Sequence, residues 1–161
     1  MASSLPTFPH VQQAAKILQD VAYQTPVLRS SFLDDRCGGT VFLKCENFQR
    51  TGAFKFRGAY HALACKESSA PFHQVVTVSS GNHAQGLALA SQLLGYSAHI
   101  IMPEPVNSFK RTRVEEWGAT VTVAPTRQAG QELAQELVWR QRGLFIHPFN
   151  DADVIAGQGT A

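Results

Sequence analysis

Residues 74–94 read QVVTVSSGNHAQGLALASQLL and contain the clearest strand and helix signals of the chain. Its first five residues, 74–78, are mostly apolar and β-branched and predict a buried strand. The turn Ser79-Ser80-Gly81-Asn82 follows, and from Gly81 to Leu94 the chain is apolar on nearly every side, as expected of a buried helix. A strand that passes through a tight turn into a buried helix is typical of a βαβ unit.

The alternation of strand and helix continues toward the C-terminus, with strands expected at 97–102, 120–124 and 144–147 and helices at 107–117, 126–142 and from Asp151 onward. Toward the N-terminus we expect a helix at 11–23, a strand at 40–44 and a helix at 53–65. Short apolar strands that alternate with helices favour parallel pairing. The sequence therefore predicts an α/β fold of open parallel sheets with helices on both faces, in three layers.

The overall composition is that of a globular domain with few charged residues. The chain has 161 residues, of which 44% are hydrophobic, enough for a core of ordinary size. Only 16% are charged, against about a quarter in an average domain. Such a surface is expected where more chain or a partner subunit covers part of it, but compositional scatter explains the value equally well.

Several classes of function are disfavoured by simple counts. The net charge of +2 and the scattered basic residues disfavour nucleic-acid binding. No apolar run approaches the ~18 residues that span a membrane, and residues 1–10 lack the pattern of a signal peptide. Cys37, Cys45 and Cys65 have neither metal nor redox spacing and indicate reduced thiols in a cytoplasmic protein. The six histidines show no ligand spacing, so no metal site is predicted in this segment.

A lysine between two phenylalanines is the first candidate for chemistry. The segment KCENFQRTGAFKFRGA, residues 44–59, places Lys55 between Phe54 and Phe56 in a glycine-containing turn at a helix N-terminus. The helix dipole and the apolar neighbours both disfavour the ammonium form, so we expect the pKa of Lys55 to be lowered. A neutral amine is the form that adds to an aldehyde cofactor. For this segment alone, a surface lysine beside two core phenylalanines is the more common case.

The turn between the buried strand and the buried helix is the second candidate. Free amide groups at a helix N-terminus bind anions, and the hydroxyl groups of Ser79 and Ser80 add donors, so a substrate carboxylate suits this place. A plain helix cap, in which Ser79 or Ser80 satisfies the helix start, is the simpler alternative for this segment alone.

Taken together, in this order and at this separation, the two segments resemble the lysine motif and the Ser-Ser-Gly-Asn-His loop of fold-type II pyridoxal-phosphate enzymes. The similarity covers nearly the whole chain and includes QTPVL at 24–28, HPFND at 147–151 and VIAGQGT at 154–160. Phe56 after the lysine and His83 after the asparagine are similar to serine/threonine dehydratases and serine racemases. Cysteine synthases and cystathionine synthases typically have aspartate and threonine at these two places.

The resemblance implies a role for the residues of both segments. Lys55 is expected to hold pyridoxal 5'-phosphate as a Schiff base and, once the substrate amine displaces it, to act as a base at the substrate Cα. Phe54 is expected beside the cofactor ring, and Asn82 is expected to bind the phenolic oxygen of the cofactor. The substrate carboxylate is expected on the loop formed by Ser79, Ser80, Gly81, Asn82 and His83.

The implied reaction is the dehydration of a serine- or threonine-type β-hydroxy amino acid to a keto acid and ammonia, which is an ammonia-lyase activity. Serine racemisation is also compatible, because Ser80 has the position of the second acid/base that serine racemases use on the opposite face of Cα. Ala84 stands where typical serine racemases have glycine and matches many dehydratases, which favours the dehydratase. The expected partner is a small amino-acid substrate, and homodimers are common in the family.

The end of the chain predicts a truncation. Residues 157–161 lie in the opening turns of an expected helix without a stop signal, and family members are considerably longer. We expect residues 1–70 to form part of a large domain with the cofactor lysine, 71–148 a small α/β domain, and 149–161 the start of a helix that returns to the large domain. The second half of the large domain, with the glycine-rich phosphate loop and any divalent-cation site, is expected to be absent. The enzyme activity is therefore expected of the parent protein, whereas the 161 residues alone are expected to show little or no turnover. The alternative hypothesis is a catalytically inactive truncated isoform or pseudo-enzyme that retains weak ligand binding or subunit association.

Overall fold

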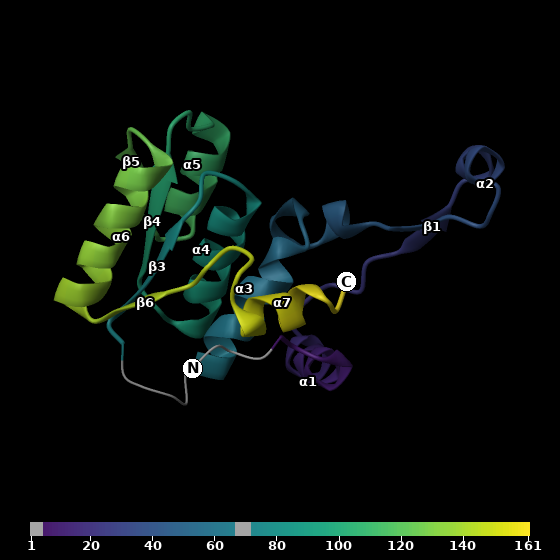
Figure 1. The fold of residues 1–161 in the computed structure, drawn as a ribbon, viewed down its shortest axis with the longest axis horizontal. Helices are drawn as coiled ribbons and strands as arrows, with labels where there is room; N and C mark the ends of the chain where they lie inside the picture. Colours follow the sequence, from purple (N-terminus) through teal and green to yellow (C-terminus); the bar gives the residue numbers. More distant parts are fainter. Residues whose placement is uncertain (1–4, 67–71) are drawn as a thin grey trace.

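The computed structural model describes residues 5–66 and 72–161, which form a mixed α/β structure (Figure 1). The elements in chain order are α1 (Phe8–Leu18), β1 (Val27–Arg29), α2 (Ser31–Cys37), β2 (Phe42–Lys44), the 3₁₀ turns η1 (Glu46–Phe48) and η2 (Arg50–Gly52), α3 (Lys55–Lys66), β3 (Gln74–Val78), α4 (Asn82–Leu94), β4 (Ala98–Pro103), α5 (Ser108–Glu116), β5 (Thr120–Ala124), α6 (Arg127–Gln141), β6 (Gly143–Phe145) and α7 (Ala152–Gln158). Strands β3 and β5 have the predicted bounds, and the helices from α4 onward begin one residue after the predicted starts.

Strands β3 to β6 form a parallel sheet in the order β5-β4-β3-β6. Consecutive side chains of a strand point to opposite faces, so a strand that is apolar at every position is buried on both. Val75 of β3 packs in the cluster that contains Leu87 of α4 and Val114 of α5, whereas Val76 packs in the cluster that contains Leu137 of α6. Helices α4 and α5 therefore cover one face of the sheet and α6 the other (Figure 1), which confirms the predicted fold class.

Two glycines bring α3 against its neighbours. In α4, a Cβ on Gly86 would lie 3.0 Å from the backbone nitrogen of Phe56. In α7, a Cβ on Gly157 would lie 2.7 Å from the carbonyl oxygen of Arg57. The approach at Gly157 is too close for a side chain, so the packing requires glycine there, whereas at Gly86 a Cβ fits only if the backbone of α3 shifts by a few tenths of an ångström. The N-terminal turn of α3, which carries Lys55, therefore lies against both α4 and α7.

A short antiparallel pair projects from the rest of the molecule (Figure 1). The strand predicted at 40–44 contains β2, but neither β1 nor the pairing was predicted. Strand β1 pairs with β2 in the register Leu28↔Leu43, and α2 connects them. Every residue of both strands is exposed, and α2 has no buried residue. Strand β1 has three exposed residues and shows neither an alternating pattern nor a core-length apolar run, so periodicity does not detect it.

Two further expectations need correction. The helix predicted at 11–23 ends at Leu18, because tertiary hydrogen bonds hold the residues that follow it. Arg50 Nε donates to the Val21 carbonyl oxygen at 2.7 Å, and the backbone of Tyr23 exchanges two hydrogen bonds with the side chain of Gln49. Helix α4 is not buried on every side, because Leu93 is 48% exposed.

The predicted domain boundary between residues 70 and 71 lies outside the described residues, and the division into domains stays a prediction. Among the residues that the structure describes, no helix is both long and apolar enough to cross a membrane.

Candidate active site

Lys55 is the first residue of α3, and two acceptors from the C-terminal end of the chain hold its side chain. Its Nζ donates to the carbonyl oxygen of Pro148 at 2.9 Å and to Oε1 of Gln158 at 3.1 Å. The centroid of the Phe54 ring lies 5.2 Å from the same nitrogen. Burial lowers the pKa of the Lys55 amine, in the predicted direction. The structure thus contains a half-buried amine that is easier to deprotonate than an ordinary lysine.

The turn before Lys55 is strained. Thr51 and Gly52 both have left-handed backbone conformations, with φ angles of 62° and 72°. Glycine adopts this conformation freely, but for a β-branched residue it is rare and costs about 1–2 kcal/mol. The hydroxyl oxygen of Thr51 is also buried, with no hydrogen-bond partner among the described residues. Strain of this kind persists only where surrounding contacts hold the backbone, and it is common beside functional residues.

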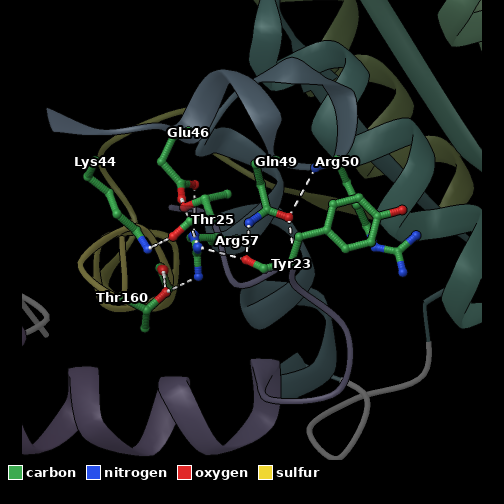
Figure 2. A network of polar contacts seen from close by, with 9 residues as sticks. Tyr23, Thr25, Lys44, Glu46, Gln49, Arg50, Arg57 and Thr160 are labelled. Carbon is green, nitrogen blue, oxygen red and sulfur yellow. Dashed lines mark hydrogen bonds and ion pairs between the residues drawn. The ribbon is translucent and has the colours of Figure 1, made fainter. Parts of the chain in front are cut away.

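A nearly buried ion pair supplies part of those contacts (Figure 2). Arg57 donates from Nε to Oε2 of Glu46 and from a terminal nitrogen to Oε1, each at 2.8 Å. Thr25 donates its hydroxyl to Oε1 of the same carboxylate at 2.6 Å. Burial alone would raise the pKa of the Glu46 carboxyl, but the hydrogen bonds from Arg57 and Thr25 outweigh burial and lower it. Glu46 therefore stays ionised at neutral pH and keeps both bonds to the guanidinium group.

Backbone carbonyl groups complete this network. Arg57 also donates to the Tyr23 carbonyl oxygen at 3.2 Å, and Lys44 Nζ donates to the Thr25 carbonyl oxygen at 2.9 Å. Gln49 exchanges two hydrogen bonds with the Tyr23 backbone, each at 2.9 Å. Figure 2 shows these groups converging from the segments 23–25 and 44–50 and from α3. The network fixes the strained turn against the start of α3, and with it the backbone of the lysine that follows.

The second predicted segment forms the turn between β3 and α4. Gly81 is the residue before α4, and no side chain in the described ranges caps the helix start. The Ser79 hydroxyl instead accepts a hydrogen bond from the N–H of Gly81 at 3.3 Å, and the N–H of Ser79 donates to the Ile101 carbonyl oxygen at 2.9 Å. The plain helix cap is therefore not formed. The amide groups of Ser79 and Gly81 already have partners, so the first turn of α4, which includes His83, offers the amide groups for an anion.

Ser80 and Asn82 occupy different surroundings on this turn. Ser80 is half-buried between β3 and α4, whereas Asn82 is exposed at the first position of α4. Oδ1 of Asn82 accepts a hydrogen bond from Nζ of Lys110, in α5, at 3.1 Å. The role of Asn82 toward the cofactor and the role of Ser80 as a second acid/base stay predictions.

His83 is the buried titratable residue of the site. Its side chain is 3% exposed, and neither ring nitrogen has a hydrogen-bond partner among the described residues. Burial lowers its pKa to about 4, and the positive charge of Lys55 acts in the same direction. The imidazole is therefore neutral at neutral pH and adds no second positive charge beside the amine.

Pro148 and Gln158 are residues of the candidate site that the sequence analysis did not identify. They lie 93 and 103 positions after Lys55 in the chain, within the segments HPFND and VIAGQGT that carried the resemblance but received no role. The only sequence signal for these two residues was that they lie in segments similar to the family. A groove of about 640 Å³ between α6 and β6 is lined in part by Val78, Phe145 and Pro148, so it reaches the residue whose carbonyl group binds the amine.

Comparison with known proteins identifies the family of this chain. The sequence pattern of the family described as "Pyridoxal-phosphate dependent enzyme" matches residues 18–161. The chain belongs to this family. Its fold is also that of solved family structures: the serine racemase of Dictyostelium discoideum superposes with a TM-score of 0.89 at 36% sequence identity, over 98% of this chain and 52% of that one.

Two curated relatives are ammonia-lyases. The chain is 43% identical to the L-threo-3-hydroxyaspartate ammonia-lyase of a Pseudomonas species, over 98% of this chain and 50% of the relative. It is 40% identical to the L-threonine ammonia-lyase of Thermotoga maritima, over 96% of this chain and 39% of the relative. The chain therefore spans about half the length of the relatives it matches, or less.

The residues in place fit the cofactor of the pyridoxal-phosphate dependent enzymes. An aldehyde requires an amine that can lose its proton, and Lys55 offers a half-buried amine with a lowered pKa. Gly86 lets α4 approach the backbone of Lys55 and Phe56 directly, so the uncapped start of α4 belongs to the same region of the fold. In the described part of the chain, no group of three or more His, Cys, Asp or Glu residues could hold a metal ion.

Proposed function

We propose that the protein is a pyridoxal-phosphate dependent ammonia-lyase that converts small β-hydroxy amino acids of the serine and threonine type into a keto acid and ammonia. The observation that carries the proposal is the Lys55 amine, half-buried, lowered in pKa and held by the Pro148 carbonyl group and Gln158. Relatives named L-threo-3-hydroxyaspartate ammonia-lyase and L-threonine ammonia-lyase support the choice of reaction.

The residues of the candidate site have distinct roles in the proposed reaction. Pyridoxal phosphate, when bound, supplies an electron sink for the negative charge that remains on the substrate Cα after proton loss. Lys55 binds the cofactor and, when released, takes the Cα proton at Nζ, because its lowered pKa favours the free amine. The first-turn amide groups of α4 bind and orient the substrate carboxylate. His83 stays neutral beside the amine and therefore does not oppose proton uptake by Lys55.

Serine racemisation is the second candidate. Its support is Ser80, which lies half-buried in the turn at the start of α4, together with the relatives named serine racemase.

We also propose a cytoplasmic location, supported by three cysteines that are free in the structure.

The test is a Lys55-dependent covalent link to the cofactor. The purified chain is mixed with pyridoxal phosphate, reduced with borohydride, and digested for mass mapping, beside the variants Lys55→Ala and Lys16→Ala. Lys16 is an exposed lysine of α1 and controls for random reaction of surface amines. We expect a reducible visible absorbance band in the native chain and in Lys16→Ala, absent in Lys55→Ala, with the label on the Lys55 peptide.

Turnover is then measured as pyruvate release from serine and 2-oxobutyrate release from threonine. A folded chain that shows no Lys55-dependent band would contradict the proposed role of Lys55. A band without keto-acid release would support the catalytically inactive alternative for this chain. Racemisation is followed in the same samples as D-serine, with Ser80→Ala expected to abolish D-serine formation.

A further inference from the structure

The turn that carries Pro148 is closed by a histidine side chain. Nδ1 of His147 accepts hydrogen bonds from the N–H of Asn150 at 2.8 Å and from the N–H of Phe149 at 3.3 Å. Asparagine and aspartate close turns in the same way, with a side-chain acceptor that binds backbone N–H groups two and three residues later. The imidazole of His147 therefore closes the turn 147–150.

Aromatic neighbours fix the orientation of this ring. The centroid of the Phe149 ring lies 4.6 Å from that of His147 and the Phe145 ring lies 6.1 Å away, both edge-on. Edge-to-face contacts favour one ring orientation over others. Burial lowers the pKa of His147, so the ring is neutral and Nδ1 keeps the lone pair that accepts the two bonds.

The closed turn determines where the acceptors of Lys55 lie. The Pro148 carbonyl oxygen accepts from Lys55 Nζ at 2.9 Å, and Nε2 of Gln158 donates to the same oxygen at 3.4 Å. Gln158 also presents Oε1 to the amine at 3.1 Å. The continuation of the turn is fixed by Asp151, whose Oδ1 accepts from the N–H groups of Asp153 and Val154 at the start of α7. A lysine side chain is flexible, so these acceptors decide where its nitrogen rests.

We propose that His147 is a positioning residue for Lys55: it closes the turn 147–150, and the closed turn holds the Pro148 carbonyl group against the lysine amine. This inference rests on the proposed function, in which the Lys55 nitrogen is the reacting atom. His147 acts through Pro148 and touches neither the amine nor a substrate.

The test uses two substitutions with opposite expectations. His147→Asn keeps a side-chain acceptor, and asparagine before proline favours a turn, so the turn should stay closed. His147→Leu removes the acceptor. His99→Leu is the matched control, because His99 is a half-buried histidine of β4 whose side chain binds Thr122 Oγ1.

The readout is hydrogen exchange of the lysine ammonium groups with water, followed by nitrogen-15 NMR on the cofactor-free chain at pH 6.5. In the native chain, in His147→Asn and in His99→Leu, we expect Lys55 to exchange about tenfold more slowly than the exposed Lys16, because a charge-assisted hydrogen bond must open first. In His147→Leu, Lys55 should exchange several-fold faster than in the native chain, but still more slowly than Lys16, because the Gln158 acceptor remains.

Two outcomes overturn the inference. One is exchange of Lys55 in a folded His147→Leu chain that is as slow as in the native chain. The other is the absence, in the native chain, of a hydrogen-bond coupling between the Lys55 nitrogen and the Pro148 carbonyl carbon. This measurement needs no variant, so it does not depend on the folding of His147→Leu. Neither measurement uses pyridoxal phosphate, so a chain that fails the cofactor test of the proposed function can still pass or fail this one.

Discussion

Lowering the pH should weaken the fold through His83, the buried imidazole near Lys55. The folded chain holds its pKa at about 4, against 6.5 for an ordinary histidine. As the pH falls below 6.5, the unfolded chain therefore takes up a proton that the folded chain does not. Proton binding then favours the unfolded state, so stability that is present above pH 6.5 is lost progressively toward pH 4.

The size of the effect follows from the two pKa values. A histidine with a pKa near 4 in the folded chain and 6.5 in the unfolded chain loses about 3 kcal/mol of stabilisation once both states are protonated. Between pH 7 and pH 5 the same values give about 2 kcal/mol. Burial also lowers the pKa values of His147 and His99, so these side chains add to the loss in the same direction.

The comparison of variants isolates the contribution of His83. Urea unfolding at pH 7 and pH 5 gives the free energy of unfolding for the native chain, for His83→Leu and for His73→Leu, the same change at an exposed histidine. We expect the loss between the two pH values to be smaller by about 2 kcal/mol in His83→Leu and unchanged in His73→Leu. An equal loss in the native chain and in His83→Leu would refute the assignment of a depressed pKa to His83.

Three further changes test the packing around Lys55 by urea or thermal unfolding. Arg57→Met leaves the nearly buried carboxylate of Glu46 without its ion-pair partner and should lower the free energy of unfolding by about 3–5 kcal/mol. A double variant that also carries Glu46→Leu should lose less stability. An equal or greater loss in the double variant would contradict a stabilising ion pair. Gly86→Ala should lower stability by about 1–3 kcal/mol and reduce the yield of cofactor on the lysine, because the new Cβ would lie 3.0 Å from backbone. Gly39→Ala, which has open space, is the control. Thr51→Gly relieves a left-handed conformation and a buried, unpaired hydroxyl, so it should raise the thermal midpoint by a few degrees; a lower midpoint would show that the turn is not strained.

The strands and helices that the sequence predicted best belong to the part of the chain that forms the parallel sheet and its covering helices. Strands β3 and β5 have their predicted bounds. Helices α5, α6 and α7 begin directly after a capping residue, which is Asn107, Thr126 and Asp151 in turn. These signals are local, because a cap binds N–H groups two or three residues away. The end of α1 was not predictable from local signals, since the hydrogen bonds that hold residues 21–23 come from residues 49 and 50.

The sequence alone was enough to predict the α/β class, the two candidate segments and the lowered pKa of Lys55. Residue type and spacing are enough for these, because burial, turn formation and helix starts depend on neighbours along the chain. Only the tertiary structure decided what the Lys55 amine binds. Its acceptors lie 93 and 103 positions away and reach it because Gly157 lets α7 pack directly on the backbone of α3, a contact between distant segments that no local pattern records.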